Sequence, residues 1–140
     1  MRSFLLATHG YFADGIYNSL KIIMGEQNNV STLCAYVDGK NDLKKEVLKI
    51  INKMKKDEEL IVLTDIFGGS VNNEFMNYIG KGKIHLISGL NLPLLIELIS
   101  RQEEEDIELL IEDVLIGSKK TIQYCNSILK SAEKVEDEDF

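Results

Sequence analysis

The sequence predicts an α/β fold: a doubly wound, mainly parallel sheet in strand order 2-1-3-4 with helices on both faces. Short runs of consecutive apolar residues are typical of strands that are covered on both sides. Between these runs, apolar residues recur at helical spacing, and alternation of the two patterns is typical of right-handed βαβ units. The length of 140 residues suits one domain. We expect that domain over residues 1–132, followed by an acidic tail over residues 133–140.

Four apolar runs predict the strands, and each is followed by a turn or a polar residue. The runs are Phe4 to Ala7, Val30 to Val37, Leu60 to Leu63 and Ile84 to Ile87. The third run is the most uniformly apolar, which favours a buried position for it in the sheet.

Helical patterns follow the strands, and capping residues indicate their ends. The predicted helices are an apolar stripe from Ile16 to Met24 closed by Gly25, a stripe from Leu43 to Met54 capped by Asn41 or Asp42, Val71 to Ile79, and Leu94 to Arg101 with Pro93 in its first turn. From Ile107 to Leu129 the pattern is helical again, with Gly117 and Ser118 as a candidate break. Part of this region is a candidate for an extra edge strand.

Composition excludes several classes of protein. A formal net charge of −7 argues against a nucleic-acid-binding protein, which usually presents a basic face. No apolar run approaches the roughly 20 residues of a membrane span, and the N-terminal run is too short for a signal peptide. Cys34 and Cys125 lack metal-ligand spacing and are expected to be buried free thiols. We therefore expect a soluble, cytoplasmic protein without a metal site.

Two polar stretches follow predicted strands, at the sheet edge where such folds place their chemistry. Thr8-His9-Gly10 follows the first strand, and Asp65-Ile66-Phe67-Gly68-Gly69-Ser70 follows the third. In the order 2-1-3-4 these two strands are neighbours, so His9 and Asp65 are expected to meet although 56 positions separate them. A histidine titrates near neutrality, and a carboxylate can fix its tautomer, so the pair predicts a nucleophile and its orienting group.

The glycines of the second stretch predict an anion cradle. Gly68, Gly69 and Ser70 precede a helix, and glycines allow backbone amides to converge on an anion. The lysine and the spacing of a nucleotide-binding P-loop are missing, so we expect no ATP site and no cofactor. Each feature alone also has a structural explanation: a surface or capping histidine, a turn aspartate, or a glycine turn with a helix cap.

In this order and spacing, the motifs resemble the IIA component of the mannose family of the bacterial phosphoenolpyruvate-dependent sugar phosphotransferase system. The likeness runs from Phe4 to about Leu129. Three blocks carry it: Thr8-His9-Gly10 with Met24-Gly25-Glu26, Thr64 to Ser70 with Asn73, and Gly89 to Glu97.

The resemblance implies a cytoplasmic phosphotransferase. His9 would take a phosphoryl group from the phosphohistidine of HPr and pass it to a IIB component, which is linked to the membrane components IIC and IID. Asp65 would hold the Nδ1–H of His9, and Ser70 with its neighbours would contact the phosphoryl oxygens. The resemblance also implies a homodimer with a C-terminal strand, from the region after Asp106, exchanged between subunits. It does not identify the sugar.

Two other functions fit the same predicted fold. One is a phosphoryl relay subunit for a dihydroxyacetone kinase. The other is a non-catalytic, flavodoxin-like regulatory module that binds a phosphate-bearing ligand at the glycine loop and carries no covalent change on His9.

Overall fold

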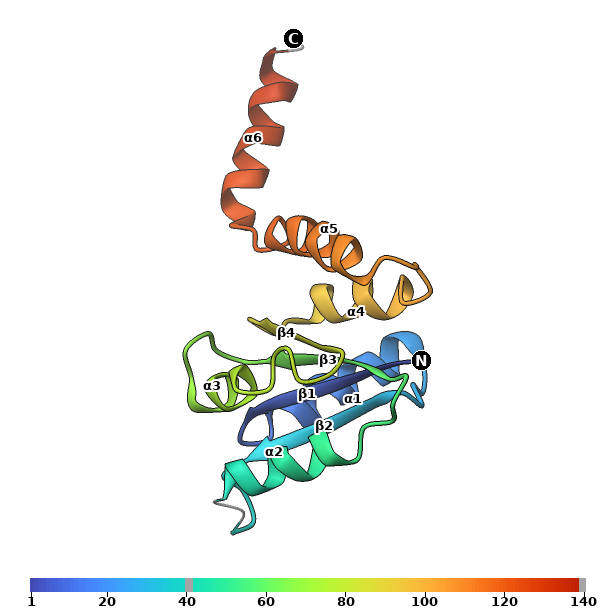
Figure 1. Cartoon of the computed structure of the whole chain (residues 1–140). Helices are drawn as coiled ribbons and strands as arrows, with labels where there is room; N and C mark the ends of the chain where they lie inside the picture. Colours follow the sequence, from blue (N-terminus) through green and yellow to red (C-terminus); the bar gives the residue numbers. More distant parts are fainter. Residues whose placement is uncertain (40–41, 139–140) are drawn as a thin grey trace. The chain divides into compact units, whose positions relative to one another are not determined.

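The computed structural model of the chain describes residues 1–39 and 42–138, with side chains as far as residue 133. The chain divides into two compact units, Met1–Gln102 and Glu103–Phe140. The first unit contains β1 (Arg2–His9), α1 (Phe12–Met24), β2 (Val30–Ala35), α2 (Leu43–Asn52), β3 (Glu59–Thr64), α3 (Ser70–Met76), β4 (Ile84–Ser88) and α4 (Leu92–Ser100) (Figure 1). The second unit contains α5 (Ile107–Lys119) and α6 (Cys125–Glu138).

The sheet has the order β2-β1-β3-β4, and all of its strand pairs are parallel. The register places Phe4 of β1 between Val30 of β2 and Ile61 of β3. The predicted doubly wound α/β fold and its strand order are therefore confirmed. Because β1 and β3 are neighbours, the loops that leave their carboxyl ends start side by side (Figure 1).

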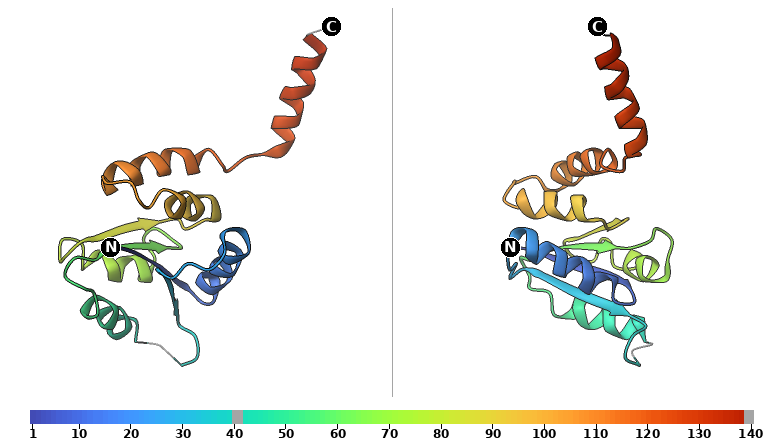
Figure 2. Two further views of the ribbon diagram at one scale, coloured as in Figure 1. Left: turned by 90° about the vertical axis from the view of Figure 1, so that its right-hand side faces the viewer. Right: turned by 180° about the vertical axis from the view of Figure 1, so that it is seen from behind.

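Helices cover both faces of the sheet, which explains the continuously apolar strands. In two views α1 and α2 lie on opposite sides of it; α4 packs with α1, and α3 packs with α2 (Figure 2). Alternate strand residues point to opposite faces. The core on the α2 and α3 side contains Leu5, Ala7, Leu33, Ala35, Val47, Val62, Val71 and Phe75. The intervening residues Phe4 and Leu6 are equally buried.

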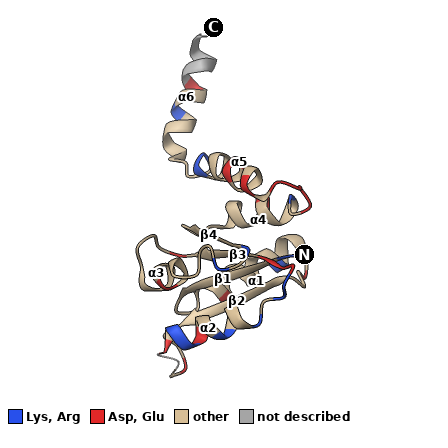
Figure 3. Cartoon of the chain, in the orientation of Figure 1, with Lys and Arg blue, Asp and Glu red and all other residues tan. Residues whose placement is uncertain are grey.

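Helix ends agree with the capping residues of the sequence. Gly25 follows α1 with φ +82°, a left-handed conformation that favours glycine. The Asp42 side chain accepts from the backbone N–H of Lys45 at 3.1 Å and caps α2, whereas Asn41 lies outside the described residues. Asn91 caps α4 by accepting from Leu94 N–H at 3.0 Å. The lysines of α2, namely Lys44, Lys45 and Lys49, are exposed and give this helix a basic surface (Figure 3).

The second unit differs from the prediction. Gly117 and Ser118 do not break the helix: the Ser118 hydroxyl donates to the carbonyl of Val114 at 2.5 Å, and α5 continues to Lys119. The interruption falls instead between Lys119 and Cys125. The extra edge strand is absent from the described residues after Asp106. These residues form α5 and α6, as their helical periodicity predicts.

The predicted domain boundary falls inside a helix. Residues 133–138 of the predicted acidic tail belong by their backbone to α6, and residues 139 and 140 lie outside the described part of the chain. The domain over 1–132 with a separate tail stays a prediction.

Candidate functional site

The structure brings His9 and Asp65 together at the carboxyl ends of β1 and β3. Nδ1 of His9 lies 2.9 Å from Oδ2 of Asp65. The backbone N–H of His9 also donates to Oδ2 at 2.9 Å, and the N–H of Ile66 donates to Oδ1 at 3.1 Å. The expectation that strand order joins these two residues is confirmed, and one carboxylate holds both the main chain and the ring of His9.

A threonine before each of these residues anchors it to the following helix. The Thr8 hydroxyl accepts from the backbone N–H of Ala13 at 2.8 Å, which ties the end of β1 to α1. The Thr64 hydroxyl donates to Oδ1 of Asn72 at 2.7 Å, which ties the end of β3 to α3. Both threonines and Asn72 are buried. Buried, satisfied hydrogen bonds of this kind hold the adjacent His9 and Asp65 in fixed positions.

Electrostatics define the protonation of the pair. Partial burial alone raises the pKa of Asp65, but the hydrogen bonds from the His9 backbone N–H and ring, together with the charge of that ring, outweigh it and hold the pKa below its usual value. Asp65 is thus a carboxylate, which can only accept hydrogen bonds, so Nδ1 of His9 carries a proton. In the neutral ring the lone pair then lies on Nε2. The His9 side chain is 40% exposed.

The glycine loop lies on the Nε2 side of the ring. Oγ of Ser70 is 3.3 Å from Nε2 of His9. Gly68 has φ +80°, which a glycine adopts without strain. The N–H of Gly69 donates to the carbonyl of Ile66 at 3.2 Å, whereas the N–H groups of Gly68 and Ser70 have no hydrogen-bond partner within the described residues. Asp65, Gly69 and Ser70 thus lie beside the His9 ring, and two backbone amides of the same loop are still able to donate.

Tyr36 also lies at the site, although it was not predicted from the sequence. Its hydroxyl lies 2.8 Å from Oγ of Ser70, and its ring centroid lies 5.7 Å from that of His9. The predicted second strand ran to Val37 and therefore placed Tyr36 inside the strand, whereas β2 ends at Ala35. An aromatic residue at the end of an apolar run was the one available signal.

Exposed apolar side chains follow Asp65. Ile66 is 58% exposed and Phe67 is 82% exposed, and both belong to the loop that carries the glycines. Exposed apolar residues beside a reactive group are typical of a surface that contacts another protein.

Neither cysteine forms a disulfide within the described residues, but the expectation that they are buried is wrong: Cys34 is half-buried and Cys125 is exposed. Among the described residues there is no group of three or more His, Cys, Asp or Glu side chains that could hold a metal ion.

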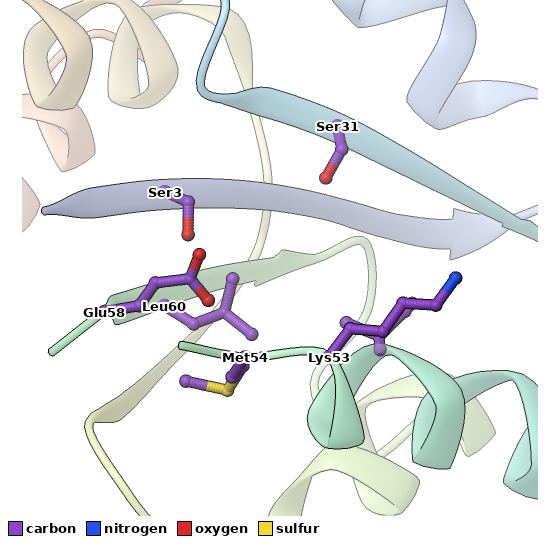
Figure 4. A pocket seen from close by; sticks show the side chains of 7 residues that line it. Ser3, Ser31, Lys53, Met54, Glu58 and Leu60 are labelled. Atoms are coloured by element: carbon purple, nitrogen blue, oxygen red, sulfur yellow. The ribbon is translucent and has the colours of Figure 1, made fainter. Parts of the chain in front are cut away.

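A separate pocket of about 220 Å³ lies at the amino ends of the strands (Figure 4). Ser3, Ser31 and Leu60 line it from β1, β2 and β3, and Lys53 and Met54 come from the chain just after α2. The Ser3 hydroxyl is buried there without a hydrogen-bond partner in the described part of the chain. Since His9 ends β1, this pocket does not belong to the site around His9.

Comparison with known proteins identifies the family. The family model EIIA-man, described as the PTS system fructose IIA component, matches residues 3–115. The chain belongs to the EIIA-man family. It is therefore a IIA component of the sugar phosphotransferase system, a class of phosphotransferases.

Individual EIIA-man relatives match over most of their length. The PTS system fructose-specific EIIA component of Bacillus subtilis is 26% identical over 135 residues, which cover 95% of this chain and 92% of the relative. The sorbose-specific EIIA component of Klebsiella pneumoniae is 29% identical, with 96% of each chain covered. The crystal structure of PTS component EIIA from Streptococcus agalactiae is 30% identical, with a TM-score of 0.77, and the match covers 91% of this chain and 99% of that one.

Within residues 1–39 and 42–138, every helix of this EIIA-man protein is too short or too polar to span a bilayer.

Proposed function

We propose that this IIA component is a cytoplasmic phosphocarrier that accepts a phosphoryl group from the phosphohistidine of HPr on Nε2 of His9 and passes it to a IIB component. The observation that carries the proposal is the 2.9 Å contact between Nδ1 of His9 and Oδ2 of Asp65. It directs the ring proton toward Asp65 and leaves the Nε2 lone pair accessible to a donor. IIB would in turn phosphorylate a sugar that enters through the membrane components.

The transfer step uses only groups already in place. The Nε2 lone pair of His9 attacks the phosphorus, a new N–P bond forms, and the N–P bond of the donor breaks with its electron pair returning to the donor's imidazole. The Nδ1 proton stays on His9, so the phosphorylated ring is cationic, and the Asp65 carboxylate stabilises that charge. In the transfer to IIB, His9 is the donor. A nitrogen lone pair of the IIB histidine attacks the phosphorus, and the N–P bond of His9 breaks with its electron pair returning to Nε2.

Donors near Nε2 would bind the phosphoryl oxygens. The Ser70 hydroxyl, 3.3 Å from Nε2, and the unpartnered N–H groups of Gly68 and Ser70 are suited to this role. Phosphoryl transfer depends on positioning and charge stabilisation more than on a cofactor, which agrees with a site built from these groups.

The test is the intact mass of the protein after incubation with phosphoenolpyruvate, enzyme I and HPr. We expect the wild type to gain one phosphoryl group of about 80 Da that is lost in acid, as a covalent phosphohistidine intermediate requires. His9→Gln should gain none. His85→Gln is the matched control: it removes the second histidine of the chain, on β4, and should be phosphorylated as the wild type is.

An unmodified wild type, with enzyme I and HPr shown to be active on another IIA protein, would contradict the proposal. If His9→Gln were phosphorylated and His85→Gln were not, His85 would be the residue that carries the phosphoryl group. That result would also contradict the proposal.

We also propose that the protein is a homodimer. In the second unit, Ile122, Tyr124, Ile128 and Leu129 are at least half exposed. Exposed apolar residues clustered in one segment are typical of an interface. A second copy of the same chain is the partner we propose, and exchange of a C-terminal segment between the copies stays a prediction.

A further inference from the structure

Tyr36 contacts two of the site residues from a third loop. Its ring lies beside that of His9, with centroids 5.7 Å apart, and its hydroxyl is 2.8 Å from Oγ of Ser70. Ser70 in turn reaches Nε2 of His9. The chain Tyr36–Ser70–His9–Asp65 therefore joins the loops after β1, β2 and β3.

The protons in this chain have one consistent direction. Asp65 accepts from Nδ1–H of His9, so in the neutral ring Nε2 can only accept. Ser70 must then donate its single hydroxyl proton to Nε2. Because that proton is committed, the hydrogen bond between Ser70 and Tyr36 has the Tyr36 hydroxyl as its donor.

The backbone at Tyr36 is strained in a way that supports a function. Tyr36 has φ +65°, in the left-handed region that non-glycine residues rarely adopt. Such residues persist where surrounding contacts hold them, and they concentrate at functional sites. Here the turn begins directly after β2, and it places the side chain against His9 and Ser70.

We infer that Tyr36 is a positioning residue for phosphoryl transfer at His9. By donating to Ser70, it holds the Ser70 hydroxyl beside Nε2 before transfer. As the Nε2 lone pair enters the N–P bond, the Ser70 proton leaves Nε2 and turns to a phosphoryl oxygen while Tyr36 continues to donate. A hydrogen bond received by Ser70 polarises its hydroxyl and strengthens the bond to the phosphoryl oxygen, which forms only as the phosphoryl group arrives. This inference rests on the proposed function.

The test compares phosphoryl acceptance by Tyr36→Phe, Ser70→Ala and the double variant, with Tyr11→Phe as the matched control. Tyr36→Phe keeps the ring beside His9 and removes only the hydroxyl. Tyr11→Phe also removes one phenolic hydroxyl. That hydroxyl donates at 2.9 Å to Asp38, which lies in the same loop as Tyr36, and it does not contact Ser70. We expect Tyr36→Phe to accept phosphoryl groups about 3- to 10-fold more slowly, the range of one lost hydrogen bond, and Tyr11→Phe to match the wild type.

The double variant separates positioning from a general structural effect. If Tyr36 acts through Ser70, Tyr36→Phe causes no further loss in the Ser70→Ala background. A loss of the same size in both backgrounds, or a wild-type rate for Tyr36→Phe alone, would overturn the inference.

A second readout does not depend on transfer. In the unphosphorylated protein, the ¹⁵N resonance of His9 Nε2 should move toward that of a non-bonded ring nitrogen in Tyr36→Phe and stay in place in Tyr11→Phe. An unmoved resonance in Tyr36→Phe would overturn the inference even if His9 is phosphorylated. If the wild type gains no phosphoryl group, the proposed function fails, while this resonance still reports whether the hydrogen-bonded chain exists.

Discussion

At the scale of single residues, Asp65 determines how His9 is presented. One of its oxygens accepts both the backbone N–H and the ring of His9, and the other accepts the N–H of Ile66. An asparagine has nearly the same shape, but its NH₂ group is a donor. It would face N–H groups that donate to the carboxylate in the wild type. Removing the charge therefore favours the other tautomer of the ring.

We predict that Asp65→Asn slows phosphoryl acceptance by on the order of 100-fold or more, as loss of an orienting carboxylate does in other His-dependent sites. The measurement is the initial rate with excess phosphorylated HPr, with circular dichroism to verify the fold. Asp38→Asn, which alters a carboxylate bonded to Tyr11, is the control and should stay within a few-fold of the wild type. A wild-type rate for Asp65→Asn would remove Asp65 from the mechanism.

The same carboxylate gives stability a defined pH dependence. A carboxyl group whose pKa is lowered on folding stabilises the protein above its unfolded pKa of about 3.9, and that stability is lost as the pH falls through the folded value. The stability advantage of the wild type over Asp65→Asn, measured by urea unfolding, should not fall between pH 7 and 5. It should shrink below about pH 4. An advantage that declines already between pH 7 and 6 would contradict this assignment.

At the scale of elements, the sequence predicted the strands well because burial on both faces leaves an unmistakable apolar run. It predicted their ends less well. His9 and Thr64 are polar yet continue β1 and β3, because the ladder of backbone hydrogen bonds does not depend on side-chain polarity. Tyr36 shows the opposite error: an aromatic residue of high strand propensity turns left-handed instead. The backbone at that position depends on contacts with residues distant in sequence.

The loop between β3 and α3 is closely packed against the site, so we predict a specific effect of adding one methyl group. A Cβ at residue 69 would lie 3.2 Å from the Ile66 carbonyl oxygen and 3.3 Å from Cε1 of His9, which is tighter than ordinary contact. Gly69→Ala should displace the ring and reduce the phosphoryl acceptance rate by about 10-fold or more.

Gly15→Ala is its matched control. Gly15 lies within α1, and its added Cβ would meet nothing within 4 Å. We expect it to raise the free energy of unfolding by about 0.5–1 kcal/mol, measured in urea, and to leave the rate unchanged. Equal phosphoryl acceptance rates for the two variants would show that the close approach of Gly69 to His9 does not affect phosphoryl transfer.

At the scale of the whole molecule, strand order was the inference on which the site depended. Once β1 and β3 were predicted to be neighbours, the meeting of His9 and Asp65 followed from topology. The contact of Tyr36 with Ser70 did not follow, because it requires a left-handed residue that the sequence does not reveal. The second unit was predicted least well: helical periodicity was visible, but the position of its interruption was not.

The assembly prediction belongs to this scale. We expect sedimentation to give twice the mass of one chain, and a double variant Ile122→Glu/Leu129→Glu to give the mass of one, because two charges would then be buried at the interface. The control is Leu48→Glu, at an exposed position on α2, which should leave the dimer intact. A wild type that sediments as a single chain at tens of micromolar would exclude the homodimer.

The hydrogen bond from Nδ1 of His9 to Asp65 has a kinetic consequence. Because the ring proton already lies opposite the carboxylate and Nε2 already has its lone pair, a phosphoryl group can arrive and leave while every nitrogen-bound proton stays where it is. The relay then requires no exchange with water during the chemical step. Its single-turnover rate should be nearly the same in heavy water as in ordinary water. It should also run forward and backward with similar ease, as the proposed role between two other phosphohistidines would require.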